Sequence, residues 1–423
     1  MHSSAIEKTY AVSKDRYAGL GVDTEAALKT LESLSLSLPC WQGDDIRGFE
    51  KTEKPLPSGG IQATGNFPGR ARTAEELRMD LEKAFSLIPG KHRLNLHAIY
   101  GEFGAKRIER DEIEPVHFKN WLAWAKQEKL KLDFNATCFS HPLAASGYTL
   151  SSKDKHTREF WVEHVKRCRK IAAFFGRELK AASLHNLWIP DGSKDIPLDR
   201  WSHRLLLKES LGEIFKAEYS SYMMKDSLEG KLFGIGSESF VVGSHEFYLG
   251  YALANRKMIC LDLGHFHPTE SVSDKVSAIL QFFKEMLLHL SRPVRWDSDH
   301  VVILDDELRS VAEEIVRCRA LPRVHIALDF FDASINRLGA WVIGARATLK
   351  AFLLALLQPE KRLRELENNG DYFGRLALLE DVKTLPFGTV WDHYCISQDV
   401  PPDVQWLKDI EHYEKKILSK RKS

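Results

Sequence analysis

The sequence predicts an α/β protein organised as a (β/α)8 (TIM) barrel, with a helical segment before the barrel and a helical extension after it. Two features of the 423-residue chain predict this class. Short apolar runs alternate with amphipathic stretches, which is the order of parallel β-α units, and about eight such units close a barrel. Ionisable side chains also gather beside the apolar runs, near where such barrels hold their chemistry. We expect residues 1–35 to form the helical segment, 36–335 the barrel and 336–423 the extension.

The expected barrel strands are short apolar runs that turn residues bound on either side. Their length is too short for helices of ordinary size, and their alternation with longer amphipathic stretches favours a parallel sheet. In chain order the runs are 34–41, 93–100, 130–138, 181–189, 231–236, 258–266, 285–291 and 324–331.

The expected helices carry apolar residues at i, i+3 and i+4 spacing, with charged residues on the opposite face. Those of the barrel are 73–88, 117–129, 155–175, 199–217, 244–257, 274–285 and 305–318. Beyond residue 336 the chain is helical at 340–357, 360–369 and 371–385. Such an extension either wraps its own barrel or packs on a neighbouring subunit, and we expect a homo-oligomer, either a tetramer or a dimer of dimers.

Composition excludes several functional classes. The chain has 60 basic and 59 acidic residues and a formal charge of +1, so it lacks the basic excess of a nucleic-acid-binding protein. No apolar run approaches the roughly 20 residues that span a bilayer, so we expect no membrane insertion. The N-terminal residues lack the apolar core of a signal peptide, and the six cysteines are scattered without C-x-x-C spacing. These features predict a reduced, cytoplasmic enzyme.

Carboxylates and histidines beside the later apolar runs form the candidate site. Because C-terminal strand ends converge on one end of a barrel, these side chains would share one pocket. So much buried negative charge requires cations, and two divalent cations would satisfy it. The residues are Glu229 and Lys231 opening the run 231–236, then Asp262, His265, His289, Asp297, Asp299 and Asp329.

Each of these residues has an ordinary structural explanation when it is taken alone. An Asp-x-Asp is usually a turn, a lone histidine beside apolar residues is usually a core residue, and a Glu-x-Lys is usually a surface pair. The joint pattern favours a metal site instead. Carboxylates with a few imidazoles suit Mn²⁺, Mg²⁺ or Co²⁺, and also admit Zn²⁺. We expect no cysteine within the cluster.

The segment 43–72 falls outside the strand–helix repeat. It is rich in Gly and Pro and follows the first expected strand at the end of the barrel where the site should lie. It is interpreted either as a mobile lid over the site or as a plain surface loop.

Several motifs resemble the L-rhamnose isomerase family. The order Glu-x-Lys, Asp-x-x-His, a ligand before Asp-x-Asp, and a final Asp is similar to the two-metal centre of xylose isomerase-like barrels. More specific likenesses to the L-rhamnose isomerase family run from about residue 39 to 341. They include PCWQGDD, GGIQATGNFPGRAR, RLNLHAIY, HFKNWLAWA, LFGIGSES, GHFHPTE and WDSDHVV.

The resemblance implies reversible conversion of L-rhamnose to L-rhamnulose. Carried over by position, it implies that Glu229, Asp262, His289 and Asp329 hold a structural cation. It also implies that His265, Asp297 and Asp299 hold a catalytic cation, with Asp262 between the two. Lys231 and Asp329 are expected to assist at substrate oxygens, with Asp297 counted among the catalytic groups. A hydride shift and a proton-abstracting enediol route both remain open, and the first fits Lys231 better.

Four further residues fit a sugar pocket. Trp188 and Phe331 offer flat apolar faces to the C–H surface of a sugar, Ile99 fits the 6-methyl group and His97 fits a hydroxyl. Ordinary barrel core is the alternative for each of them.

Two other enzyme classes also place Glu, Asp and His at barrel strand ends. A metal-dependent phosphodiesterase or nuclease would call for a basic surface, which the overall charge does not provide. An amidohydrolase-type barrel carries its His-x-His on the first strand, whereas His265 and His267 stand near the sixth. A non-catalytic barrel braced by metals would not require Lys231, Asp297 and Asp299.

Overall fold

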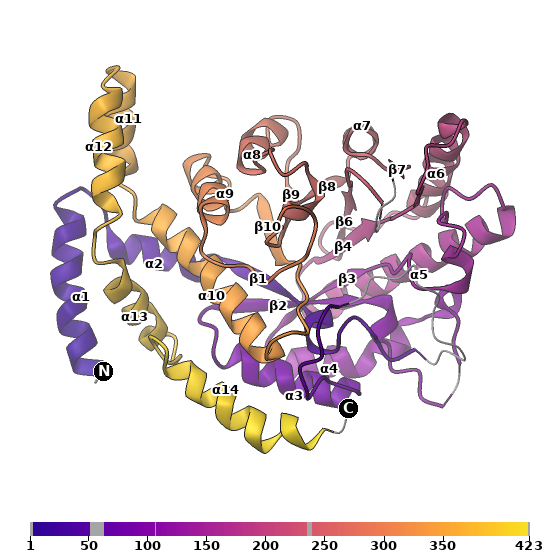
Figure 1. Cartoon of the computed structure of the whole chain (residues 1–423), viewed down its shortest axis with the longest axis horizontal. Coiled ribbons are helices and arrows are strands. Elements are labelled where there is room, and N and C mark those ends of the chain that lie inside the picture. Colours follow the sequence, from indigo (N-terminus) through magenta and orange to yellow (C-terminus); the bar gives the residue numbers. More distant parts are fainter. Residues whose placement is uncertain (1–2, 51–62, 106, 235–238, 422–423) are drawn as a thin grey trace.

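The computed structural model describes residues 3–50, 63–105, 107–234 and 239–421. Eight parallel strands close a barrel in the order β1-β10-β9-β8-β6-β4-β3-β2, which confirms the predicted fold class (Figure 1). A short antiparallel pair, β5 (Gly192–Ser193) with β7 (Phe240–Val241), lies outside it. The barrel strands are β1 (Ser35–Pro39), β2 (Lys91–His97), β3 (Lys131–Asn135), β4 (Ser183–Trp188), β6 (Met224–Glu229), β8 (Met258–Asp262), β9 (Met286–Leu290) and β10 (Val324–Leu328).

Helices follow the strands around the outside of the barrel. Several begin at a side chain that accepts a hydrogen bond from the first turn, as Asp23, Thr73, Asp154 and Asp305 do. The helices are α1 (Ser3–Ala18), α2 (Thr24–Ser33), α3 (Ala74–Phe85), α4 (Lys119–Gln127), α5 (Lys155–Leu179), α6 (Arg200–Phe215), α7 (His245–Asn255), α8 (Ser273–Ile279), α9 (Asp306–Arg317), α10 (Arg337–Leu356), α11 (Glu360–Asn368), α12 (Tyr372–Val382), α13 (Phe387–Ser397) and α14 (Gln405–Lys416).

The prediction of a strand at 231–236 was wrong. The strand is β6, which ends at Glu229, and residues 231–234 lie in the following loop; residues 235–236 lie outside the described residues. The strand β6 lacks the apolar pattern of the other strands, because it carries charged residues. Asp226 pairs with Arg169 at 2.9 Å, and Lys225 pairs with Glu285. These ion pairs let charged residues occupy a buried strand. Glu229 therefore stands at a C-terminal strand end, where a barrel keeps its functional groups.

The helix predicted at 274–285 is shorter than expected, since α8 ends at Ile279. Arg323 explains the early end. Its guanidinium donates to the carbonyl oxygens of Leu280 and Phe283 at 2.7 Å and of Lys284 at 2.9 Å. Those carbonyls are thus satisfied without a further helical turn.

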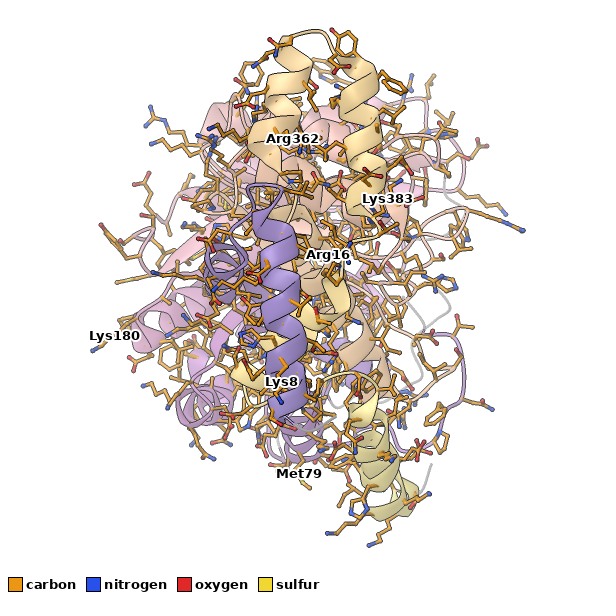
Figure 2. The ribbon with its side chains drawn as sticks, turned by 90° about the vertical axis from the view of Figure 1, so that its left-hand side faces the viewer. Lys8, Arg16, Met79, Lys180, Arg362 and Lys383 are labelled. Atoms are coloured by element: carbon orange, nitrogen blue, oxygen red, sulfur yellow. The ribbon has the colours of Figure 1, made fainter. Side chains whose placement is uncertain are left out.

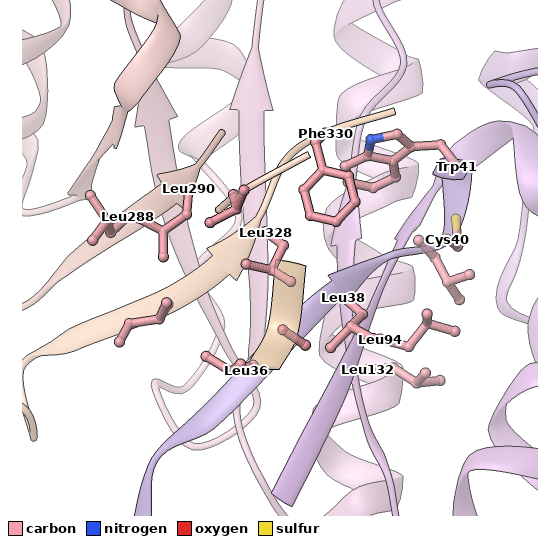
Figure 3. Close-up of a cluster of buried hydrophobic side chains, with 14 of the residues drawn as sticks. Leu36, Leu38, Cys40, Trp41, Leu94, Leu132, Leu288, Leu290, Leu328 and Phe330 are labelled. Atoms are coloured by element: carbon pink, nitrogen blue, oxygen red, sulfur yellow. The ribbon is translucent and has the colours of Figure 1, made fainter. Parts of the chain in front are cut away.

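Apolar side chains on the outer face of the strands form the main core beneath the helices. Figure 3 shows part of it, with Leu36 and Leu38 of β1 beside Leu94 of β2 and Leu132 of β3, all at most 1% exposed. Because successive side chains of a strand point to opposite faces, the residues between these leucines point into the barrel.

The interior of the barrel is layered beneath the C-terminal strand ends. At the far end Glu285 accepts from His325 at 2.6 Å and pairs with Lys225. Above this charged layer lies a small apolar cluster that is separate from the main core. It consists of Leu184, Met258, Cys260, Leu287 and Ala327. The candidate ligands Asp262, His289 and Asp329 lie above this cluster, because they stand two residues further along the chain than Cys260, Leu287 and Ala327.

The segment after residue 336 begins on the barrel. The expected boundary at 335/336 falls directly before α10, which contacts β1, α2, α3 and α9. Among the described helices, α10 is the one long and apolar enough to cross a membrane, yet 83% of its apolar window is buried inside the protein. Trp341 donates from Nε1 to the carbonyl oxygen of Pro39 at 2.8 Å and so ties α10 to β1.

Helices α11 and α12 form a hairpin that projects from the body of the molecule (Figure 1). Figure 2 shows it from the side, with Arg362 and Lys383 near its base and α1 in front of the barrel. Large apolar side chains on α12 face solvent, with Tyr372 62%, Phe373 84% and Leu376 59% exposed.

Candidate metal centre

Four predicted ligands meet at neighbouring strand ends. Glu229 ends β6, Asp262 ends β8, His289 lies in β9 and Asp329 follows β10. One ligand atom from each lies within 4.8 Å of the others. The Nδ1 atom of His289 stands 3.0 Å from Asp329 Oδ2, 3.5 Å from Glu229 Oε2 and 3.8 Å from Asp262 Oδ2. This group corresponds to the set predicted for the structural cation.

A second group shares Asp262 with the first and adds His265 and Asp297. His265 lies in a single 3-10 turn directly after β8, and Asp297 lies in the loop after β9. The Nε2 atom of His265 is 3.5 Å from Asp297 Oδ2, and its Nδ1 atom is 3.1 Å from Glu229 Oε1. Asp262 therefore stands between the two groups.

The donor atoms of both groups fit divalent cations. Asp262 Oδ2, His265 Nδ1, Asp297 Oδ1 and both ring nitrogens of His289 are buried and make no hydrogen bond with the described residues. Buried polar atoms without partners are rare in folded proteins, and clusters of them point to a ligand. Oxygen and imidazole donors at these distances are suited to a hard or borderline divalent cation.

The electrostatics of the cluster reflect crowded negative charge. Burial raises the pKa of Asp262 to about 7, and neighbouring carboxylates add to the shift. Burial works against protonation of His265, but the carboxylates of Asp262 and Asp297 outweigh it and hold the pKa of the imidazole well above its usual range. Burial also works against protonation of His289, but Cys260, Glu229 and Asp329 outweigh it and hold the pKa of this imidazole well above its usual range. Bound divalent cations would supply the positive charge that the protonated imidazoles of His265 and His289 otherwise bring to the cluster.

Asp299 lies beside the second group without belonging to it. It adopts a left-handed backbone conformation with φ 45°, and its carbonyl oxygen accepts a hydrogen bond from the N–H of Phe331. Burial and the charges of Asp297 and Asp329 raise the pKa of its carboxyl well above the usual range. The predicted role of Asp299 as a ligand therefore remains a prediction.

Lys231 contributes the ammonium group of the site. Its Nζ lies 2.5 Å from Asp297 Oδ2, and both side chains are at most 6% exposed. The same nitrogen stands 5.2 Å from the ring centre of Trp188 and 5.4 Å from that of Phe233. A buried ammonium is stable only beside a negative partner, so Asp297 fixes its position.

Sequence reasoning missed several residues around the ligands. Asn186 donates to Glu229 Oε2 at 2.5 Å, and Ser291 donates to Asp262 Oδ1 at 3.2 Å. Gly264 allows Asp297 to approach, because a Cβ at this position would overlap that carboxylate. The period of two along β4 was the available signal for Asn186, since it lies two residues before Trp188 and so faces the same way.

The expectation that no cysteine falls within the cluster was wrong. Cys260 forms a possible metal-ligating group with Glu229 and His289, and all three are buried. The same alternation explains it, because Cys260 precedes Asp262 by two residues on β8 and therefore points into the barrel.

The predicted sugar-pocket residues Trp188, His97 and Phe331 lie near the candidate ligands or their neighbours. The rings of Trp188 and His97 both contact Phe139, with ring centres 5.7 Å apart in each pair, and Trp188 stacks 6.0 Å from His265. Phe331 lies beside Asp299, because its backbone N–H donates to the carbonyl oxygen of Asp299. Ile99 is 4% exposed, and a Cβ at Gly48 would overlap it.

The predicted lid, 43–72, falls partly outside the described residues, at 51–62. Its described flanks are anchored. Arg337 pairs with Asp45 at 2.7 Å and donates to the carbonyl oxygen of Phe67 at 2.7 Å. Arg421 donates to the carbonyl oxygen of Gly69 at 3.0 Å. Residues of the C-terminal extension thus hold both flanks, and the lid itself remains a prediction.

Comparisons with known proteins agree with this geometry. The chain matches the family described as L-rhamnose isomerase (RhaA) over residues 4–421. It is 57% identical over 419 residues to an L-rhamnose isomerase of Pectobacterium atrosepticum, with 99% of each chain covered. It is 55% identical over 416 residues to an L-rhamnose isomerase of Rhodopirellula baltica, with 98% of this chain and 97% of the relative covered. The resemblance drawn from the motifs is confirmed, and the chain belongs to the L-rhamnose isomerase family.

Proposed function

We propose that this chain interconverts L-rhamnose and L-rhamnulose with the help of divalent cations held at its strand ends. Family membership supports the substrate, since relatives at 55% and 57% identity are L-rhamnose isomerases. The observation that carries the chemistry is the pair of overlapping ligand groups, in which five buried donor atoms lack hydrogen-bond partners among the described residues. Moving hydrogen between C1 and C2 requires positive charge beside both oxygens, and this arrangement suits that task.

Two divalent cations per subunit are proposed. One would be held by Glu229, Asp262, His289 and Asp329, and the other by His265, Asp297 and Asp299 with Asp262 shared. Because carboxylate oxygens dominate both sets, we favour Mn²⁺ and place Co²⁺, Zn²⁺ and Mg²⁺ as alternatives. When bound, the cations act as Lewis acids on the two substrate oxygens.

Lys231 and Asp329 are the side chains that we propose to act on the substrate. Lys231 Nζ is held by Asp297 and retains further N–H donors, which can hydrogen-bond to the oxygen on which charge develops. The side chain of Asp329 is 23% exposed, whereas the side chains of Glu229, Asp262 and His289 are at most 3% exposed. Asp329 is therefore the member of its group best placed to exchange a proton with the sugar hydroxyl.

We further propose that hydrogen passes between C1 and C2 as a hydride. Lys231 is paired with Asp297, and the carboxylates of both ligand groups are proposed to be occupied by cations. A proton-abstracting route needs a base that is free to act at carbon. Lys231 and the ligand carboxylates are engaged with one another or with cations, and Asp329 is proposed to act at a hydroxyl and not at carbon, which favours direct transfer.

Removal of metal should abolish the reaction. Protein dialysed against a chelator should convert no L-rhamnose, and added Mn²⁺ should restore ketose formation, because the ligands alone cannot polarise the sugar oxygens. The same assay run in D₂O separates the two routes, since hydride transfer leaves deuterium out of C1 and C2. Full turnover by protein shown by elemental analysis to hold no metal would contradict the proposal.

The wall formed by Trp188, Phe139 and His97 is proposed to receive the sugar. The charge of Lys231 stands over Trp188, and the aromatic faces suit the C–H surface of a sugar. Burial lowers the pKa of His97 to about 3, so the imidazole is neutral and can both donate and accept a hydrogen bond. Phe331 and Ile99 are proposed to close the pocket around the remaining carbons.

Ile99 is proposed to contact the 6-methyl group of L-rhamnose. L-mannose carries CH₂OH in its place, and an apolar pocket rejects an added hydroxyl only moderately, by about 10²-fold. Ile99→Thr should therefore narrow the ratio of kcat/KM values for the two sugars while metal content stays the same. Ile99→Val is the matched control, since it has the shape of Thr without the hydroxyl. An unchanged ratio in the Thr variant would place the methyl group elsewhere.

We propose that the chain assembles as a homotetramer through its C-terminal extension and acts in the cytoplasm. The exposed side chains of Tyr372, Phe373 and Leu376 support an interface on α12, because monomers rarely leave such residues together in solvent. Light scattering should show a tetramer for the wild type and a smaller species for Phe373→Glu. A monomeric wild type would overturn this assembly.

The six cysteines are free and five of them are buried, which fits the reducing environment of the cytoplasm. Recovery of the native chain in the cytosolic fraction would test this location.

A further inference from the structure

Cys260 is a candidate ligand that the proposed reaction does not use. One ligand atom each from Cys260, Glu229 and His289 lie within 4.8 Å of one another. The backbone fixes this neighbourhood, because Cys260 is the register partner of Glu229 across the β6–β8 pair. His289 lies on the next strand, where it pairs with Asp262. Three strands thus aim a thiol, a carboxylate and an imidazole at one point.

The imidazole supplies a second, independent observation. His289 is 2% exposed, and neither of its ring nitrogens makes a hydrogen bond with the described residues. Cys260 is 1% exposed and belongs to the apolar cluster that underlies the site. A thiol at this position belongs to an apolar cluster on one side and lies beside the imidazole of His289 and the carboxylate of its register partner Glu229. Polar atoms that are buried in this way point to a ligand.

The donor set differs in kind from that of the groups above it. Thiolate sulfur selects soft or borderline cations, whereas a carboxylate cluster suits Mn²⁺ or Mg²⁺. We propose that Cys260, Glu229 and His289 form a subsite for thiophilic divalent cations such as Cd²⁺ and Zn²⁺, one layer deeper in the barrel than the site proposed for Mn²⁺. As the sulfur–cation bond forms, the thiol proton leaves to solvent.

Occupation of this subsite should inhibit the enzyme. Glu229 and His289 serve both positions, so a cation bound to Cys260 withdraws two of the four ligands proposed for the structural cation. Cd²⁺ and Mn²⁺ should therefore compete. The inference rests on the proposed function only through these two shared ligands.

Cadmium binding to the full-length chain tests the subsite. Cys318 is the exposed cysteine, so Cys318→Ser provides a background in which the remaining thiols are buried. After dialysis against a chelator, titration with Cd²⁺ should produce a sulfur-to-cadmium charge-transfer band in the ultraviolet that saturates at one equivalent. Adding Cys260→Ser should remove the band and lower Cd²⁺ affinity by about tenfold or more, while Mn²⁺ affinity changes far less.

Cys138→Ser in the same background is the matched control, because Cys138 is also buried but belongs to none of the ligand groups of the described residues. It should keep the band. If circular dichroism shows that the Cys260→Ser protein is unfolded, the Cys260→Ala protein should be titrated instead, and it should also lack the band. Mn²⁺ added first to the Cys318→Ser protein should suppress the band, which needs no change at Cys260.

Persistence of the band in a folded Cys260 variant, or failure of Mn²⁺ to suppress it, would overturn the inference. The two proposals fail separately. Protein that shows the Cys260-dependent band yet isomerises no L-rhamnose with Mn²⁺ would contradict the proposed function alone.

Discussion

Replacing Asp297 by Asn should lower kcat by about 10³-fold and leave the protein folded. Asp297 Oδ2 lies 2.5 Å from Lys231 Nζ and 3.5 Å from His265 Nε2, so one carboxylate positions both an ammonium and a predicted ligand. Burial raises the pKa of Asp297, but the charges of His265 and Lys231 outweigh this effect and lower it to about 2. The group is therefore a carboxylate throughout the working pH range, and a neutral amide cannot take its place.

Asp306→Asn is the matched control for this variant, because its fully exposed side chain lies outside both ligand groups. It should retain wild-type kcat. The Asp297→Asn protein should lose a modest part of its stability, because the buried Lys231 ammonium loses its carboxylate partner, and this loss should be smaller than that of the His289→Ala protein. Turnover within tenfold of the wild type would remove Asp297 from the catalytic groups.

Replacing His289 by Ala should weaken folding as well as turnover. His289 contacts ligands from three other segments, so its loss removes a donor on which several strand ends converge. Breaking a buried polar network of this kind costs about 3 kcal/mol or more of the free energy of unfolding. In addition, each tenfold loss of Mn²⁺ affinity removes about 1.4 kcal/mol of cation-dependent stabilisation.

Thermal unfolding with and without Mn²⁺ measures both effects. The stabilisation that Mn²⁺ confers should be smaller in the His289→Ala protein than in the Asp297→Asn protein. His267→Ala provides the matched control, because His267 is exposed and its imidazole bonds only to nearby Thr269 among the described residues. Equal melting temperatures for the His289→Ala and Asp297→Asn proteins, with both still binding two cations, would contradict the assignment of the two sites.

Apolar strands and their ends could be predicted from the sequence, but polar strands could not. The run 258–266 could be predicted as a strand because most of its side chains are apolar. It contains β8, whose residues are all buried, and the candidate ligands Asp262 and His265. The strand β6 was not predicted, because charged residues such as Lys225 and Asp226 are typical of a protein surface. Their partners, Glu285 and Arg169, lie 60 and 57 residues away in the chain. Such pairing is a property of the closed barrel and leaves no local pattern.

The candidate ligands were predictable because barrel geometry brings strand ends together whatever their sequence distance. Side chains one layer deeper were not considered, and for this reason Cys260 and Asn186 were missed. Each lies two residues before a predicted site residue, Asp262 and Trp188 respectively. The alternation of a strand assigns them to the interior, but their neighbours depend on register between strands, as in the pairing of Glu229 with Cys260.

The small apolar cluster beneath the ligands blocks any passage through the interior of the barrel to its other end. Leu184, Met258, Leu287 and Ala327 are each at most 8% exposed, and beyond them lies the charged layer at Glu285. A sugar that reaches the ligands can go no further, so the product must depart by the route through which the substrate arrived. We therefore expect aldose and ketose to compete for the same place beside the ligands, so that each inhibits the conversion of the other competitively.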